Sequence, residues 1–176
     1  VQIHAIGGFG HQLRALGTAS GDEVRVEGKV DRVDCYHGSD RDYIRVIDYK
    51  TGGKKFDLSE VVQGLNMQML LYLFTLGENG VADLPSPGEA GVLYMPGSGH
   101  FTRNRRDASA ESIAEDQRKS YCMSGMVLDN PEVIEAMELG TAGRYIPVSL
   151  KKDGSYTATS SVITEEQLGL LRRQIA

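Results

Sequence analysis

The sequence predicts an α/β domain with a central mixed β-sheet flanked by helices. Two segments rich in β-branched residues, 23–34 and 43–50, flank a polar turn at 35–42 and predict an antiparallel hairpin. A segment with strong helix-capping signals follows, and then a short apolar run at 90–95. A strand, a helix and a strand in this order indicate a right-handed βαβ crossover, so part of the sheet is expected to be parallel.

The second strand of the hairpin ends in charged residues where an apolar strand would be expected to continue. Ile44, Val46 and Ile47 make both of its faces apolar, which is typical of a strand buried on both sides. Asp48 and Lys50 then share one face, because alternate side chains of a strand point the same way. A carboxylate and an ammonium in such a place are costly unless each has a partner.

Asp31 lies near the end of the neighbouring strand and can bring a second carboxylate to Asp48. Two close carboxylates repel each other unless a proton or a cation lies between them, and a divalent metal is the natural occupant. Hard oxygen ligands suit Mg²⁺, whose bound water can attack a phosphodiester. Lys50 would position or deprotonate that water, or neutralise the charge that builds on the phosphate oxygens. The pattern therefore predicts metal-dependent phosphodiester hydrolysis.

Residues 58–76 are predicted to form one helix beside these strands. Asp57 is a good N-cap, Glu60 stands where it would complete a capping box, and Gly77 is expected to end the helix. The helix follows the glycines after Lys50 and leads to the apolar strand at 90–95. It is therefore the crossover helix of the βαβ unit.

Within this helix Gly64, Gln68 and Tyr72 recur every four residues and form one stripe. Taken alone, the stripe is explained by a core tyrosine at Tyr72 and a buried amide at Gln68 that bonds to the backbone. Beside the two carboxylates and the lysine, a catalytic role for Gln68 and Tyr72 is favoured instead. A catalytic role for the two residues requires that both side chains lie on the helical face that points to the strand ends, and their four-residue spacing provides this.

The remaining segments supply elements around this centre. Residues 9–16 fit either a short helix or an extended connection, and Arg32 with Asp34 is expected to form a structural ion pair. The arginines at 103, 105 and 106, with Arg118 and Lys119, fit either a DNA contact or a solvated surface. The other predicted elements are an edge strand at 1–9, helices at 109–121 and 132–139, a hairpin around 151–154, and a helix after a capping box at 164–167.

Composition is that of an ordinary globular domain, and residues 1–176 are expected to form one domain. The chain is 40% hydrophobic and 24% charged, and no apolar run approaches the roughly 20 residues of a membrane span, so no membrane partner is expected. Cys35 and Cys122 form neither a disulfide framework nor a zinc site and favour a reducing cytoplasm. The net charge of −5 argues against a general DNA-binding surface, so any grip on DNA is local or comes from a partner.

Three linked motifs resemble those of the PD-(D/E)xK nucleases, and within them the RecB-like nuclease domain of the AddB subunit of bacterial AddAB helicase-nucleases. The resemblance is strongest over residues 24–76 and faint in the second half of the chain. The motifs are Gly28-x-x-Asp31-Arg32-x-Asp34, Ile47-Asp48-Tyr49-Lys50-Thr51-Gly52 and Gly64-x-x-x-Gln68-x-x-x-Tyr72.

The resemblance implies a restriction-endonuclease-like core and a Mg²⁺-dependent DNA exonuclease, with Mn²⁺ as a possible substitute. The enzyme would cut a single strand fed by a helicase, in double-strand break repair and recombination. The implied site residues are Asp31, Asp48 and the backbone carbonyl of Tyr49 as metal ligands, Lys50 at the attacking water, Gln68 at the metal and phosphate, and Tyr72 at the DNA end.

The resemblance also implies partners and a cofactor beyond these residues. DNA and an AddA-like helicase-nuclease subunit would be the partners, and the protein would be cytoplasmic. The iron–sulfur cluster of the AddB family has no matching cysteines here, so it is expected only in a full-length protein, outside this fragment. None of His4, His11, His37 and His100 matches the upstream metal ligand of many relatives, so the ligand set is expected to be incomplete.

Two alternatives remain open. One is a catalytically inactive domain that guides DNA within a helicase-nuclease complex. The other is a stand-alone RecB-like nuclease of the phage or CRISPR-associated type, which shares the chemistry but not the partner.

Overall fold

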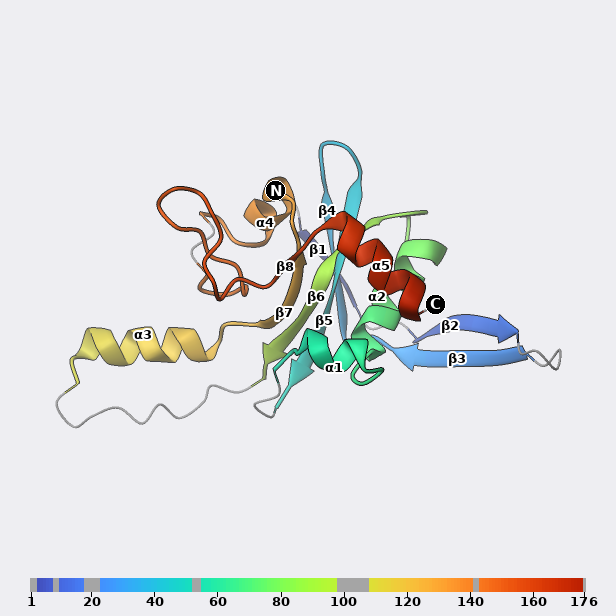
Figure 1. Ribbon diagram of the computed structural model, residues 1–176, viewed down its shortest axis with the longest axis horizontal. Coiled ribbons are helices and arrows are strands. Elements are labelled where there is room, and N and C mark those ends of the chain that lie inside the picture. Colours follow the sequence, from blue (N-terminus) through green and yellow to red (C-terminus); the bar gives the residue numbers. More distant parts are fainter. Residues whose placement is uncertain are drawn as a thin grey trace.

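A six-stranded mixed sheet forms the centre of the protein, as a computed structural model shows (Figure 1). The structure describes residues 3–7, 10–17, 23–51, 55–97, 108–140 and 143–175. The strands lie in the order β1-β4-β5-β6-β7-β8, and helices flank them, which confirms the predicted fold class. Their bounds are Ile3–Gly7 for β1, Arg32–His37 for β4, Asp42–Lys50 for β5, Gly88–Pro96 for β6, Ser124–Leu128 for β7 and Val162–Ile163 for β8.

A second, two-stranded sheet pairs β2 (Gly10–Gly17) with β3 (Glu23–Lys29) in antiparallel fashion. Residues 10–16, for which the sequence fits either a helix or an extended connection, are thus extended. The prediction of one strand over 23–34 was wrong, because the chain leaves β3 at Lys29 and starts β4 only at Arg32. Asp31 therefore lies at the junction between the two sheets.

The predicted hairpin and crossover are both confirmed. β4 and β5 pair antiparallel, from Arg32↔Ile47 to His37↔Asp42, and β5 and β6 pair parallel. The predicted edge strand is also confirmed, because β1 pairs only with β4 in the sheet order.

The predicted single helix over 58–76 was wrong, because the crossover contains two helices, α1 (Leu58–Val62) and α2 (Gln68–Asn79). Gly64 and Asn66 between them have φ values of +81° and +54°, which an α-helix does not allow. Asp57 caps α1 as expected by accepting a hydrogen bond from the Ser59 backbone N–H at 2.8 Å. The Glu60 carboxylate does not close a capping box but accepts a hydrogen bond from Asn66.

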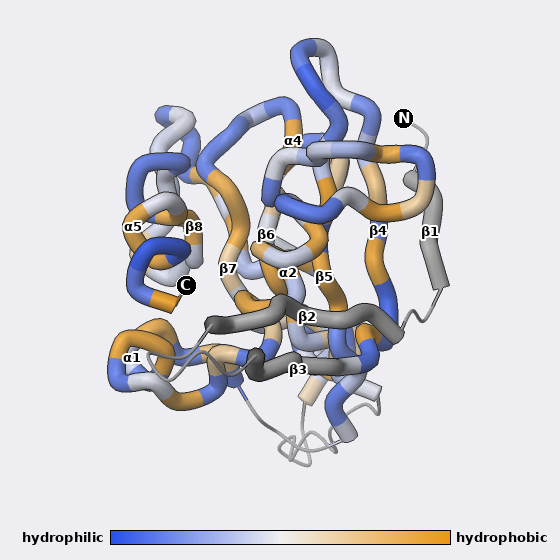
Figure 2. Tube along the Cα trace, turned by 90° about the vertical axis from the view of Figure 1, so that its right-hand side faces the viewer, coloured by the Kyte–Doolittle hydropathy of each residue, from blue (hydrophilic) through white to orange (hydrophobic). Residues whose placement is uncertain are grey.

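Two hydrophobic cores lie on opposite faces of the sheet. α2 and α5 (Glu165–Ile175) cover one face and α4 (Pro131–Met137) the other (Figure 1). The central strands β5, β6 and β7 are largely apolar, as the orange segments of Figure 2 show. The α2 face buries Ile44, Val46, Val92, Met126, Leu70 and Leu73, and the α4 face buries Ile47, Leu93, Val127, Ile134 and Ile146.

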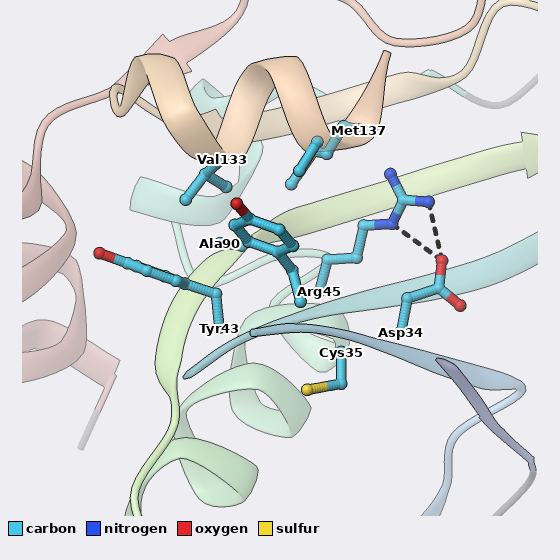
Figure 3. Close-up of a pocket in the computed structure, with 9 residues that line it drawn as sticks. Asp34, Cys35, Tyr43, Arg45, Ala90, Val133 and Met137 are labelled. Carbon is cyan, nitrogen blue, oxygen red and sulfur yellow. Dashed lines mark hydrogen bonds and ion pairs between the residues drawn. The ribbon is translucent and has the colours of Figure 1, made fainter. Parts of the chain in front are cut away.

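The α4 face also contains a buried charge cluster centred on Asp34. Asp34 accepts hydrogen bonds from Arg32 Nε at 2.6 Å and from Arg45 Nε and Nη2 at 2.9 and 2.7 Å. Arg45 lies against a small pocket beneath Val133 and Met137 of α4 (Figure 3). The expected Arg32–Asp34 ion pair is confirmed, and Arg45 is a second partner. The bond to Asp34 raises the pKa of Arg32.

The other predicted helices are present with shifted ends. Ser109 caps α3 (Ala110–Ser120), and Pro131 begins α4. Thr164 and Gln167 form the predicted capping box, because each accepts a hydrogen bond from the backbone N–H of the other. The residues around 151–154 make a turn with a single bridge, Leu150↔Tyr156, instead of a hairpin of two strands. Within the described residues, no helix combines the length and apolar character needed to cross a bilayer.

Candidate functional site

Asp48 and Lys50 lie at the end of β5, on the face of the sheet that α2 covers. Ile44 and Val46 precede them on the same face and are fully buried, so the strand periodicity carries the two charged side chains to the edge of the core. Lys50 Nζ lies 2.5 Å from Asp48 Oδ2, and the two side chains are 30% and 19% exposed. The prediction that they share a face is thus confirmed, and they form an ion pair.

Asp31 joins this pair from the start of β4. Arg32 pairs with Ile47, so the hairpin register extended by one residue sets Asp31 opposite Asp48. The Tyr49 backbone N–H donates a hydrogen bond to Asp31 Oδ2 at 3.2 Å. The structure therefore brings Asp31, Asp48, Tyr49 and Lys50 together where β4 begins and β5 ends.

The charges at this site favour an ammonium at Lys50. Its close contact with Asp48 raises the pKa of Lys50, burial opposes this, and the Asp31 carboxylate adds a smaller attraction. Lys50 is therefore positively charged at neutral pH. It suits a role as a cation that orients or neutralises better than a role as a proton acceptor.

The donor atoms fit a hard divalent cation. Asp48 Oδ2 is buried, and no described group donates a well-directed hydrogen bond to it, although the Lys50 ammonium is close. Asp31 supplies a second carboxylate, and Tyr49, the residue after Asp48 on β5, has a main-chain carbonyl. Mg²⁺ is commonly bound through one or two carboxylates while it keeps several waters. Within the described residues, no group of three or more Asp, Glu, His or Cys side chains is placed to hold a metal ion. Asp31 and Asp48 are therefore the only acidic ligands that this part of the chain brings to the site.

Gln68 and Tyr72 meet on the first turns of α2. Gln68 Nε2 donates a hydrogen bond to the Tyr72 hydroxyl at 2.6 Å; Gln68 is exposed and Tyr72 is buried. Gly64 lies outside the helix, so the predicted stripe of three residues is a pair. This pair lies on the same side of the sheet as Asp48 and Lys50, because α2 packs on β5 and β6.

Sequence reasoning missed Tyr94 as a member of the site. The parallel register of β5 and β6 sets Tyr94 beside Asp48, and Lys50 Nζ lies 5.2 Å from the centre of its ring. Burial raises the pKa of Tyr94, the Lys50 charge lowers it, and the carboxylates of Asp48 and Glu60 raise it further. The only signal in the sequence was a single polar ring in the apolar run at 90–95.

Among the other candidate residues, His37 lies away from this edge, whereas the basic residues of α3 are solvent-exposed. His37 pairs with Asp42 at 2.6 Å, at the opposite end of β5 from Lys50. Arg118 and Lys119 are exposed in the last turn of α3, and Arg118 pairs with Glu115 at 3.6 Å. The arginines at 103, 105 and 106 lie outside the described residues.

Comparison with known sequences decides the family. A model of the PD-(D/E)XK nuclease superfamily matches residues 2–168, nearly the whole chain. This chain belongs to the PD-(D/E)XK nuclease superfamily. Nucleases of this superfamily generally use divalent metals such as Mg²⁺.

Relatives of this nuclease-superfamily chain have names that agree with one another. Proteins named as a subunit of an ATP-dependent helicase/deoxyribonuclease are 36% identical over 167 residues in Clostridium perfringens and 37% identical over 175 residues in Clostridium novyi. A protein of the same name in Acetivibrio thermocellus is 36% identical over 159 residues. These matches cover 91%, 96% and 89% of this chain but only 14%, 15% and 14% of the relatives. The chain thus spans about a seventh of the length of the curated relatives it matches.

Proposed function

We propose that this chain is a Mg²⁺-dependent DNA exonuclease domain that hydrolyses a single strand fed to it by a helicase. The observation that carries the proposal is the convergence of Asp31, Asp48 and Lys50 at one edge of the sheet. The names of the relatives, subunits of an ATP-dependent helicase/deoxyribonuclease, support DNA as the substrate and a helicase subunit as the partner. We further propose that this partner is AddA-like and that the protein acts in the cytoplasm in double-strand break repair and recombination.

In this proposal the strand ends hold the metal and the attacking water. Asp31, Asp48 and the Tyr49 carbonyl would bind Mg²⁺, and Mn²⁺ would replace it. The bound ion supplies a water of lowered pKa and stabilises charge on the phosphate. The Lys50 ammonium donates hydrogen bonds to that water or to a phosphate oxygen, so it orients the nucleophile and offsets negative charge in the transition state.

Gln68 and Tyr72 would act on the substrate from α2. The Gln68 amide uses one N–H for the Tyr72 hydroxyl, which leaves its other N–H and its carbonyl oxygen for the scissile phosphate and its surroundings. Tyr72 is buried, and its hydroxyl would keep Gln68 in one orientation. Tyr72 would also support the DNA end at the floor of the site.

The test is made on the protein at its full natural length, with any helicase subunit that purifies with it. Asp48→Asn is expected to abolish Mg²⁺-dependent release of nucleotides from end-labelled DNA, while ATP-driven unwinding persists. Asp42→Asn is the matched control, since Asp42 lies at the other end of β5 and pairs with His37. Wild-type cleavage by Asp48→Asn, or loss of cleavage by Asp42→Asn, would overturn the proposal.

The second candidate function is a domain that guides DNA without cutting it. The small acidic set is the observation that favours it, because only Asp31 and Asp48 converge within the described residues. Titration calorimetry with Mn²⁺ separates the two candidates. A catalytic domain binds the ion and loses binding in Asp48→Asn, whereas a guide binds DNA equally well with and without the ion and cuts nothing.

A further inference from the structure

Two neighbours on the sheet surface hold the Lys50 ammonium. One is the Asp48 carboxylate, whose Oδ2 lies 2.5 Å from Nζ, and the other is the Tyr94 ring, whose centre lies 5.2 Å from Nζ. An ammonium within about 6 Å of an aromatic ring centre is attracted by the negative face of the ring. A lysine side chain has many rotamers, so two fixed neighbours restrict it strongly.

The Tyr94 ring is itself fixed. It is 6% exposed, and β6 holds its backbone in register with Asp48. Phe56 packs near it, with ring centres 6.3 Å apart and planes inclined by 52°, an arrangement typical of paired aromatic rings. Because little water reaches the ring, its attraction for a cation is less screened than on an open surface.

The two neighbours differ in what else they can bind. Asp48 is a proposed ligand of the divalent cation, so with a cation bound its carboxylate charge would be divided between the cation and the Lys50 ammonium. The Tyr94 ring face offers no ligand to Mg²⁺, which takes oxygen ligands. The attraction between the Tyr94 ring and the Lys50 ammonium therefore persists when a bound cation weakens the attraction between Asp48 and Lys50.

We propose that Tyr94 is a positioning residue, whose ring face keeps the Lys50 ammonium at the site while Asp48 serves the bound cation. This inference rests on the proposed nuclease function. Without the ring, the Lys50 side chain would turn toward solvent when Asp48 binds the cation, and the attacking water would lose the donor that orients it.

A second cation–ring pair on the same face supplies a matched control. Arg172 of α5 lies 5.4 Å from the centre of the Phe74 ring on α2, and Phe74 is 5% exposed. Arg172 also pairs with Glu89, near the start of β6, whereas Tyr94 lies near its end. The two rings thus match in burial and in cation distance, but only one touches the proposed site.

The experiment replaces Tyr94 in the protein at its full natural length and measures single-turnover cleavage in saturating Mg²⁺. Tyr94→Phe keeps the ring face and is expected to stay within about threefold of wild type, because the hydroxyl is not part of the contact. Replacing Tyr94 by phenylalanine with one, two and three ring fluorines weakens the negative face while nearly keeping the shape. Cleavage is expected to fall with each fluorine, to about 3- to 30-fold below Tyr94→Phe for the last.

A double-mutant comparison shows whether Tyr94 acts through Lys50. Tyr94→Leu is expected to reduce cleavage in the wild-type background and to have no further effect in Lys50→Ala. Phe74→Leu is expected to lower the melting temperature as much as Tyr94→Leu while cleavage below that temperature stays at the wild-type rate. If Tyr94→Leu does not fold, the fluorine series alone decides.

The outcomes separate this inference from the proposed function. If the wild-type protein does not cleave DNA, the proposed function fails and Lys50 has no water to orient. If the wild-type protein cleaves but fluorination leaves the rate unchanged, the nuclease assignment stands and the role of Tyr94 is overturned. Equal losses from Tyr94→Leu with and without Lys50 would also overturn it.

Discussion

Gln68 Nε2 donates a hydrogen bond to the Tyr72 hydroxyl across one turn of α2, at 2.6 Å. The two side chains differ sharply in burial, because Gln68 is exposed and Tyr72 is 4% exposed. The bond therefore links a side chain available to substrate with one anchored in the core. Substitutions at the two positions are expected to have separable effects on cleavage and on stability.

Gln68→Ala is expected to reduce cleavage about tenfold or more, because it removes the donor proposed to contact the scissile phosphate, and to leave the melting temperature nearly unchanged. Nucleotide release and a thermal melt of the same preparation measure the two effects. Gln63→Ala is the control, since Gln63 is an exposed glutamine in the connection between α1 and α2. Cleavage by Gln68→Ala at the wild-type rate would reduce the Gln68–Tyr72 pair to a structural feature.

Tyr72→Ala is expected to lose cleavage and to lower the free energy of unfolding by about 2–4 kcal/mol, because a large buried ring is replaced by a cavity. Tyr72→Phe keeps the ring and removes only the hydroxyl that fixes Gln68. It should retain most of the stability and still cut slowly. Urea unfolding curves show the difference, and equal destabilisation by both variants would contradict this account.

The elements that the sequence predicts correctly carry their signals locally. The hairpin of β4 and β5 follows from β-branched residues on either side of a polar turn, and the Thr164 capping box follows from four adjacent residues. The sequence predictions fail where the residues on both sides of a break between two elements favour the same secondary structure. β-Branched residues run from β3 into β4, so nothing nearby shows that the chain changes sheets at Asp31. A glycine at position 64 fits two structures, a helix face without side-chain bulk or a turn with positive φ. The structure has the turn, since Gly64 has a φ of +81°.

Some residues of the candidate site can likewise be predicted from local sequence, and others cannot. Strand periodicity alone sets Asp48 and Lys50 on one face, and the hairpin brings Asp31 opposite them. Tyr94 is more than forty positions away, and its place beside Asp48 depends on the parallel register of β5 and β6. Such long-range register has no signature in the composition of either strand.

Asp34→Asn is expected to destabilise the protein by about 3–5 kcal/mol, because it leaves Arg32 and the buried Arg45 without their shared carboxylate. Chemical unfolding of residues 1–176 measures the loss. Asp42→Asn removes a carboxylate from an exposed pair with His37 and should cost no more than about 1 kcal/mol. Similar unfolding midpoints for the two variants would show that Asp34 has no special role in stabilising the core beneath α4.

The Glu132 carboxylate predicts a pH dependence of stability. The Ser39 hydroxyl, the Tyr36 hydroxyl and the Ser39 backbone N–H donate hydrogen bonds to it and lower its pKa from the ordinary value of a glutamate. A lowered folded-state pKa contributes stability that is present above the unfolded-state pKa and is lost as pH falls through the folded-state pKa. Wild type should therefore lose more stability than Glu132→Gln on acidification from pH 5 downward. Urea midpoints over that range test this, and parallel curves for the two proteins would contradict it.

Asp48→Asn tests whether Asp48 serves a cation or only its neighbour Lys50. The variant keeps the shape of the side chain and removes one of two facing carboxylate charges, so without metal it should be as stable as wild type or more stable. Lys50 remains partly exposed and keeps its contact with the Tyr94 ring, so it is not stranded. Wild type should gain about 2.7 kcal/mol of stability at free Mg²⁺ roughly 100 times its dissociation constant, and Asp48→Asn should gain nothing.

Thermal melts of both proteins with and without Mg²⁺ measure these differences, and Asp42→Asn should respond to Mg²⁺ as wild type does because it leaves the site intact. A metal-free Asp48→Asn that melts well below metal-free wild type would make Asp48 a structural partner of Lys50. The nuclease assignment of this site would then lose its central residue. A gain in metal-free stability together with loss of the Mg²⁺ response is instead expected if Asp31 and Asp48 repel each other and bind a cation. The asparagine would remove the same repulsion that the cation would relieve.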